Sequence, residues 1–219
     1  FGSDMAPSFE AIGVDAGDAV EGPGFTVNVP SAAGRSGTSE NLFVRTNEGF
    51  NGTVVTNGNR LDPGDEASVV TADDYFEFSI APTDQILDLD SVSFDFLAQD
   101  LADNKGPVAF FKTFLRSNVD GFASTLAAHT FEDVIGTGEG DTGETATQNV
   151  VATLDTSFDS LSGTTTFRIY FHDGVDSGSN LLIHRVDNIQ INGSVIPEPA
   201  TVSLLILAGA VAVTRRCRR

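Results

Sequence analysis

Apolar and polar residues alternate in three segments of the chain, at residues 74–80, 91–98 and 166–171. The apolar positions of these segments are Phe76, Phe78 and Ile80, then Val92, Phe94, Phe96 and Ala98, then Phe167, Ile169 and Phe171. Successive side chains of a β-strand point to opposite sides, so a period of two gives each segment one apolar and one polar face. The pattern predicts three β-strands that each bury one face.

Further segments are predicted as strands because apolar and β-branched residues gather in them between stretches rich in Gly, Asp, Asn, Ser or Thr. These are residues 24–29, 41–46, 53–57, 108–116, 147–154 and 180–192. No helical apolar period persists for more than a turn or two before the C-terminal tail. Many short strands and polar turns predict an all-β antiparallel β-sandwich, with the 17 phenylalanines filling the space between two sheets. We expect a jelly-roll-like strand order, which sequence does not separate from an immunoglobulin-like one.

Two local signals refine this sandwich. Asp120-Gly121 is a pair typical of tight turns, and we expect it to join adjacent antiparallel strands. In the last predicted strand, Val186 has the opposite parity to Ile189 and Ile191. One inserted residue at Asp187-Asn188 would return these side chains to a single face, which predicts a β-bulge.

The chain ends in an apolar segment followed by arginines. Residues 200–214 carry no charge, and the residues after them are Arg215, Arg216, Cys217, Arg218 and Arg219. A full membrane span needs roughly 20 apolar residues, so this segment is short, although Val195 and Ile196 extend it. Arginines beyond a span stay in the cytoplasm, which would leave residues 1–196 outside. A buried C-terminal helix is the alternative, and four arginines without acidic neighbours argue against it.

Pro197-Glu198-Pro199 lies directly before this segment. Two prolines one residue apart do not enter a helix or a sheet interior, so they hold an extended, accessible stretch at the membrane surface. Together, the three parts resemble the C-terminal sorting signal of PEP-CTERM proteins, which are exported by bacteria. The resemblance implies that an exosortase, a membrane protease-transpeptidase, recognises Pro197, Glu198, Pro199 and the four arginines, in a host that makes exopolysaccharide. We therefore expect a β-sandwich ectodomain over residues 1–195 and a sorting signal with one short transmembrane helix over residues 196–219.

Charge excludes one class of partner. The chain has 31 acidic and 12 basic residues, a net charge of -19, and residues 1–196 alone hold 30 acidic and eight basic residues. Such a surface repels phosphate backbones, so we expect no nucleic-acid partner. An acidic coat instead keeps an exported protein soluble.

Cys217 is the one cysteine, so no disulfide forms within the chain. The chain begins at Phe1 rather than Met, which indicates that a signal segment is absent from this sequence or that it is a fragment.

No group of residues predicts catalysis. Residues 138–143 match the spacing G-x-G-x-x-G, but acidic residues among them would repel a phosphate, and no helix is expected after them. His129, His172 and His184 lack the close spacing of a metal motif, and we interpret them as partly exposed structural residues. Paired carboxylates such as Asp73-Asp74 serve a glycosidase only at a defined separation. We expect a protein that is not an enzyme.

Calcium is the one cofactor with some support. The segments SNVDGF, FRIYF and RVDNIQING are similar to segments of PEP-CTERM ectodomains and of jelly-roll carbohydrate-binding modules. Such modules hold a structural calcium ion against their last strand, and the resemblance implies this role for Asp187. Carboxylates and carbonyls are the ligands that Ca²⁺ prefers, although neither an EF-hand spacing nor a glycine-aspartate nonapeptide repeat occurs.

Two functions follow for such an exported protein of the cell envelope or the extracellular space. The first is a non-enzymatic cell-surface or extracellular-matrix protein that exosortase processes. The alternative is a carbohydrate-binding, lectin-like module, with exopolysaccharide as its partner. Binding modules commonly stack sugars on exposed tryptophan or tyrosine. This chain has no tryptophan, and its tyrosines are Tyr75 and Tyr170, which favours the first function.

Overall fold

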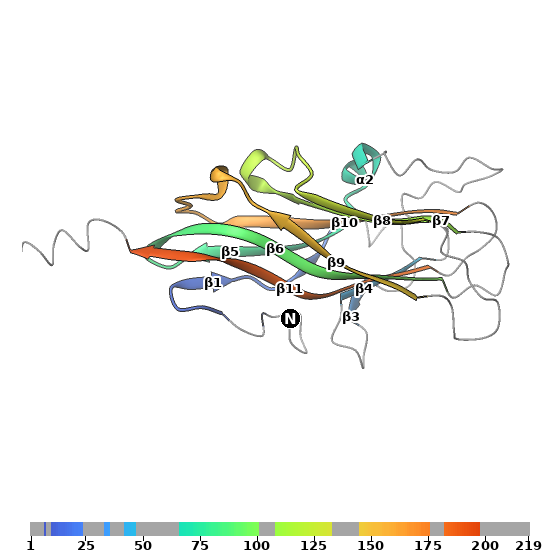
Figure 1. Ribbon diagram of the computed structural model, residues 1–219, viewed down its shortest axis with the longest axis horizontal. Helices are drawn as coiled ribbons and strands as arrows, with labels where there is room; N and C mark the ends of the chain where they lie inside the picture. Colours follow the sequence, from blue (N-terminus) through green and yellow to red (C-terminus); the bar gives the residue numbers. More distant parts are fainter. Residues whose placement is uncertain are drawn as a thin grey trace, which may run out of the picture.

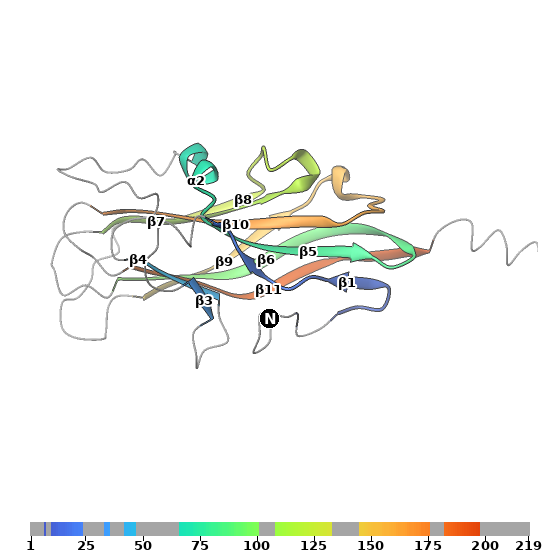
Figure 2. The same ribbon diagram turned by 180° about the vertical axis from the view of Figure 1, so that it is seen from behind.

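Two antiparallel β-sheets pack face to face, and a short helix lies on the outer side of one of them (Figure 1). The structure, a computed structural model, describes Pro7 and residues 10–23, 33–35, 42–46, 66–100, 108–132, 145–175 and 182–197. The antiparallel β-sandwich that the sequence predicts is therefore confirmed. The view from behind shows the same two layers, with the helix again on the outside (Figure 2).

The sheets share one construction, in which strands far apart in sequence lie side by side. Sheet A has the order β1 (Val14–Ala16), β5 (Tyr75–Pro82), β10 (Thr165–Val175), β7 (Val108–Ser117) and β8 (Ala127–Glu132), with β2 (Val20–Glu21) also paired to β5. Sheet B has the order β3 (Ala33–Arg35), β4 (Leu42–Thr46), β11 (Leu182–Pro197), β6 (Gln85–Asp100) and β9 (Thr145–Thr153). The remaining elements that lie within the described residues are α2 (Glu66–Ala72) and the 3-10 helices η1 (Asn118–Asp120) and η2 (Thr156–Phe158).

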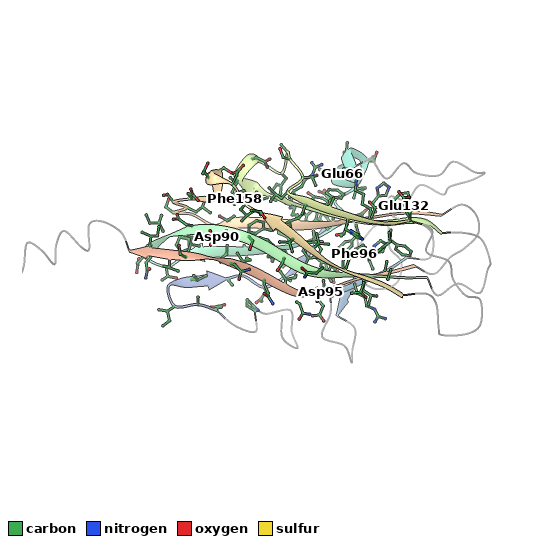
Figure 3. All side chains as sticks on the ribbon, in the orientation of Figure 1. Glu66, Asp90, Asp95, Phe96, Glu132 and Phe158 are labelled. Atoms are coloured by element: carbon green, nitrogen blue, oxygen red, sulfur yellow. The ribbon has the colours of Figure 1, made fainter. Side chains whose placement is uncertain are left out.

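The three alternating segments become β5, β6 and β10, and their apolar faces form the core. Phe76, Phe94 and Phe167 are 0 % exposed and belong to one continuous cluster between the sheets. Figure 3 shows Phe96 of β6 in the same layer. Burying one such side chain stabilises the fold by about 1.5–3 kcal/mol, so the alternation seen in the sequence supplies much of the driving force for this sandwich.

Both local signals are confirmed. Asp187 is opposite Asp95 and Gln190 is opposite Ser93, so β11 uses one residue more than β6 over this stretch. Asn188, within the bulge, has a φ of 50°. Asp120-Gly121 lies in the connection between the antiparallel neighbours β7 and β8, where η1 makes it longer than a two-residue turn.

The described elements that were not predicted are the short strands β1, β2 and β3, the strand β8, the helix α2 and the two 3-10 helices. The helix α2 has seven residues, too few for a sustained apolar period, and β8 has the sequence AAHTFE, in which alternation is weak. The predicted strands at 24–29 and 53–57, the loop at 138–143 and residues 198–219 lie outside the described residues, and so does the predicted C-terminal helix. Among the helices of the described part of the chain, none combines the length and apolar character that crossing a membrane requires.

The interpretation of the histidines as partly exposed is wrong for two of them. His172 and His184 are 1 % and 0 % exposed. The ring of His184 lies 5.0 Å from that of Phe111 and 5.6 Å from that of Phe171. The inward parity of β11 places His184 in the core, where the phenylalanines enclose it. His129 of β8 is partly exposed, as expected.

The chain truncated after Pro197 is expected to fold. β11 runs to Pro197, which pairs with Gln85 of β6, so every described strand lies within residues 1–197. Circular dichroism of the truncated chain should show a β-rich spectrum and a cooperative melting transition. A disordered or mainly helical spectrum would contradict a self-sufficient sandwich.

Candidate functional site

The outer face of sheet A carries charged and aromatic side chains at neighbouring register positions. In one row, Tyr75 of β5 is opposite Tyr170 of β10, which is opposite Phe114 of β7. In the next row, the same strands place Glu77, Arg168 and Arg116. With nearby residues of α2, β7 and the β7–β8 connection, these form what we call the cation–aromatic patch: Glu66, Tyr75, Glu77, Lys112, Phe114, Arg116, Phe122, Arg168 and Tyr170.

The rings at the base of the patch are buried. Tyr170 stacks on Phe114 with 4.9 Å between centroids and meets Tyr75 edge-on at 5.3 Å. Val69 of α2 packs on this cluster, and α2 itself lies on the outer side of sheet A (Figures 1 and 2). Burial raises the pKa of both tyrosines. Since Tyr75 is 7 % exposed and Tyr170 is 0 % exposed, neither serves as an exposed stacking platform for a sugar.

Glu66 clamps α2 onto the sheet. Its Oε1 lies 2.7 Å from Lys112 Nζ, its Oε2 lies 3.0 Å from Arg116 Nη2, and Thr125 Oγ1 also donates to Oε2. Figure 3 shows Glu66, the first residue of α2, on the outer side of sheet A. Burial alone would raise the pKa of Glu66, but hydrogen bonds from Lys112, Thr125 and Arg116 outweigh it and lower the pKa.

This clamp makes stability depend on pH. Because the pKa of Glu66 in the fold lies below its ordinary value of 4.5, the clamp contributes fully above that pH and is lost as the pH falls through the lowered pKa. Glu66→Gln is expected to cost about 1–3 kcal/mol of unfolding free energy at pH 7. The difference from wild type should shrink below pH 4.5 in melting curves recorded from pH 7 to pH 3. Glu132→Gln, at an exposed position of β8, is the control, and a pH-independent difference for Glu66→Gln would contradict the clamp.

Arg168 is held on three sides. Its guanidinium carbon lies 4.1 Å from the centre of the Tyr75 ring and 4.0 Å from that of Phe122, and its Nε donates to Glu77 Oε2 at 2.8 Å. Burial would lower the pKa of Arg168, but the interactions with Glu77 and Tyr170 raise it. Two ring faces and one carboxylate fix the orientation of this guanidinium, while 23 % of the side chain stays exposed.

The β7–β8 connection places Phe122 over Arg168 at a conformational cost. Phe122 has a φ of 61°, a left-handed conformation that costs a residue other than glycine about 1–3 kcal/mol. The surrounding bonds hold it there: Phe122 N donates to Ser117 O at 2.7 Å, and Arg116 Nη1 donates to Phe122 O at 3.0 Å. Asp120 accepts hydrogen bonds from Ala123 N and Ser124 N. Strain maintained in this way is typical of binding sites.

Polar groups continue the site along β5 and β10. Ser79 and Thr166 form the row after Glu77 and Arg168, and both are partly exposed. Asn118, which is exposed, accepts from Thr166 N at 2.9 Å and donates to Thr164 O at 3.2 Å. The exposed side of the patch therefore presents a guanidinium, a carboxylate, two hydroxyls and an amide over neighbouring strands.

Asp187, the residue implied as a calcium ligand, lies on sheet B, away from this patch. Its Oδ1 accepts from Asn188 N at 2.8 Å. The carboxylate opposite, Asp95, accepts from Asn149 and Asn188 at 2.8 and 2.7 Å, and these bonds lower the pKa of Asp95. Within the described ranges, no group of three or more His, Cys, Asp or Glu residues has an arrangement that could hold a metal ion. Calcium at Asp187 stays a prediction.

Of the residues expected in the sorting signal, the structure places Pro197 at the end of β11. Glu198, Pro199 and the four arginines lie outside the described residues. The structure thus adds one fact about this signal, which is that the sheet continues to its first residue without a linker.

Comparisons with known proteins give structural similarity alone. No family model matches the sequence, and no curated protein matches it. A carbohydrate-binding module specific for non-crystalline cellulose (CBM28) is 14 % identical with a TM-score of 0.43, over 80 % of this chain and 87 % of that one. The K1 cleaved adhesin domain of Lys-gingipain from Porphyromonas gingivalis is 12 % identical with a TM-score of 0.33, over 84 % and 93 %. The N-terminal cellulose-binding domain of Cellulomonas fimi β-1,4-glucanase C is 10 % identical with a TM-score of 0.28, over 83 % and 89 %. With TM-scores below 0.5, these similarities say nothing about what this chain binds.

Sequence reasoning did not single out the patch. Its members come from α2, β5, β7, β10 and one connection, and the register that brings them together is invisible in the sequence. The sequence did contain one indication of the patch. Residues 1–196 contain eight basic residues, and three of them, Lys112, Arg116 and Arg168, occupy alternate outward positions of predicted strands.

Proposed function

We propose that this chain is an exported, non-enzymatic carbohydrate-binding protein, and that the exposed side of the cation–aromatic patch binds the sugar. The observation that carries this proposal is the Arg168 guanidinium fixed between two rings with Glu77 beside it. A guanidinium offers donors and a carboxylate offers acceptors, which together match the hydroxyls of a sugar. Ser79, Thr166 and Asn118 would extend these contacts along the strands.

The carboxylates of the patch support a role in binding rather than catalysis. Glu66 is paired with Lys112 and Arg116, and Glu77 is paired with Arg168. General acid catalysis needs a carboxyl group with a pKa near the working pH. The lowered pKa of Glu66 is the opposite of that requirement.

The second part of the proposal concerns sorting. The order of Pro-Glu-Pro, apolar segment and arginines supports recognition of the tail by an exosortase, with a short C-terminal transmembrane helix before processing. The ectodomain would be a jelly-roll-like sandwich in the cell envelope or the extracellular space, where exopolysaccharide is the polymer it meets. A structural role in the matrix is compatible with the same tail.

Phe122→Gly tests sugar binding with little risk to the fold. Glycine adopts a φ of 61° without strain, so the variant should keep or gain stability while it loses the ring over Arg168. On a glycan array, full-length wild type in mild detergent is expected to bind polysaccharide, and Phe122→Gly to bind about tenfold less tightly, as expected for losing a stacking contact.

Ser160→Gly is the matched control. Ser160 also has a left-handed φ, at 55°, but it lies in an exposed loop outside the patch. Its substitution should leave glycan binding unchanged. Wild type that binds no glycan on the array, or equal binding by Phe122→Gly and wild type, would contradict a sugar site at the patch.

A further inference from the structure

Two positive charges lie directly opposite each other in the patch. Arg168 of β10 and Arg116 of β7 are register partners on the outer face of sheet A. Like charges at directly opposite positions of an antiparallel pair destabilise the sheet. Each arginine is balanced by a carboxylate on its far side, Glu77 for Arg168 and Glu66 for Arg116. Lys112 adds a third cation, and Asp73, which acts electrostatically on Tyr75 and Tyr170, adds a third carboxylate. The two arginines therefore concentrate positive charge at one pair of register positions in a strongly acidic chain.

The two arginines differ in what they can still bind. Arg116 donates through Nη1 to Phe122 O and Ala123 O, and through Nη2 to Glu66. Arg168 pairs with Glu77 through Nε and also interacts with the side chain of Tyr170, and among the carboxylates of the described residues no other is paired with it. Its Nη atoms lie at the far end of a partly exposed side chain. Stacking between Tyr75 and Phe122 holds these donors in one plane.

We propose that Arg168 binds the carboxylate of an acidic sugar, so that the patch selects polysaccharides containing uronic acid over neutral ones. This inference rests on the proposed function and names its ligand class. Parallel N–H donors of a fixed guanidinium match the two oxygens of a carboxylate, which gives short, charge-assisted hydrogen bonds. A ligand carboxylate above Arg168 would also offset the repulsion from Arg116.

The net charge of the protein does not prevent this. At physiological ionic strength the Debye length is about 8 Å, so acidic residues elsewhere on the surface are largely screened at the patch. Polymers with one carboxylate per sugar also carry hydroxyls, which Ser79 and Thr166 can bind. Arg116 and Arg168 concentrate positive charge at one pair of register positions, which favours a ligand that carries hydroxyls as well as carboxylates.

The test compares an acidic polymer with the same polymer lacking its carboxylates, and adds a sulfated polymer as a control for negative charge. Full-length protein in mild detergent is titrated with polygalacturonate, with the same polymer after reduction of its carboxyl groups, and with dextran sulfate. Wild type is expected to bind polygalacturonate at least about tenfold more tightly than the reduced polymer, as expected for a charge-assisted pair of hydrogen bonds. Binding of dextran sulfate with equal affinity would show selection for negative charge of any kind, and would overturn selection for the carboxylate.

Substitutions test whether Arg168 is the residue responsible for the preference for polygalacturonate. Arg168→Lys keeps the charge but removes the planar donors, and is expected to lose most of the preference for polygalacturonate, with the folded state checked by melting. Arg185→Gln is the matched control, because Arg185 lies on sheet B in β11. Equal binding of acidic and reduced polymers by wild type would overturn the inference and leave carbohydrate binding intact. Binding of neither polymer, together with a blank glycan array, would count against the proposed function itself. An equal loss in Arg185→Gln would mean general electrostatic attraction and would also overturn the inference.

Discussion

Phe96→Ala is expected to lower the free energy of unfolding by about 3–5 kcal/mol, the range for removing a fully buried phenylalanine. Phe96 is 0 % exposed and lies between the sheets (Figure 3). Its ring stacks on Phe131 at 5.3 Å and lies 5.9 Å from that of His184. Alanine would leave a cavity between the two sheets. The sheets cannot move together at one point to fill this cavity without disturbing the hydrogen bonds between their strands.

Urea unfolding of the purified chain measures this effect. Domains are typically stable by about 5–15 kcal/mol, so the variant should unfold at a much lower urea concentration with a similar slope. Val151→Ala is the control, because Val151 lies on the neighbouring strand β9 and is 55 % exposed. We expect less than about 0.5 kcal/mol for this surface substitution. A cost below about 1 kcal/mol for Phe96→Ala would mean that the layer around Phe96 is not the packed core.

Alternation was a reliable guide where one face of a strand enters the core. It identified β5, β6 and β10 with the correct inward residues, and the change of parity at Val186 and Ile189 located the bulge of β11. Each of these signals is local, because the side-chain direction of a strand reverses at every residue. The same property explains why the strand order could not be predicted, since it depends on pairings such as Arg168 with Glu77, 91 residues apart.

The outer face of sheet A shows where alternation misleads. Tyr75 and Tyr170 occupy positions that the pattern assigns to the polar side, yet both are buried because α2 covers them. The seven-residue helix has no period long enough to be recognised. Glu66, the residue that fixes it, acts through Lys112 and Arg116 on another element. Sequence therefore pointed to the tyrosines as the measure of sugar binding, whereas the structure directs attention to Arg168 and its two rings.

Processing of the tail is expected to be complete in a host that carries an exosortase. We propose that Pro197-Glu198-Pro199 presents the cleavage segment, that the apolar segment holds it in the bilayer, and that the arginines stop transfer. Because β11 and its pairing with β6 extend to Pro197, cleavage in this segment would release the whole described sandwich. The mature protein should then end near Pro197–Pro199 and lack Cys217.

Intact-mass measurement of the mature protein decides between a processed tail and a permanent anchor. Replacing both Pro197 and Pro199 by alanine removes the two residues that keep a helix from extending upstream, so unprocessed protein should accumulate. Pro82→Ala, at the end of β5, is the control and should be processed like wild type. Replacing the four arginines by glutamine should instead impair retention and orientation, because positive charge beyond the span sets topology. Wild-type protein that still ends at Arg219 in such a host would show that the tail anchors this protein permanently, and would remove exosortase from its partners.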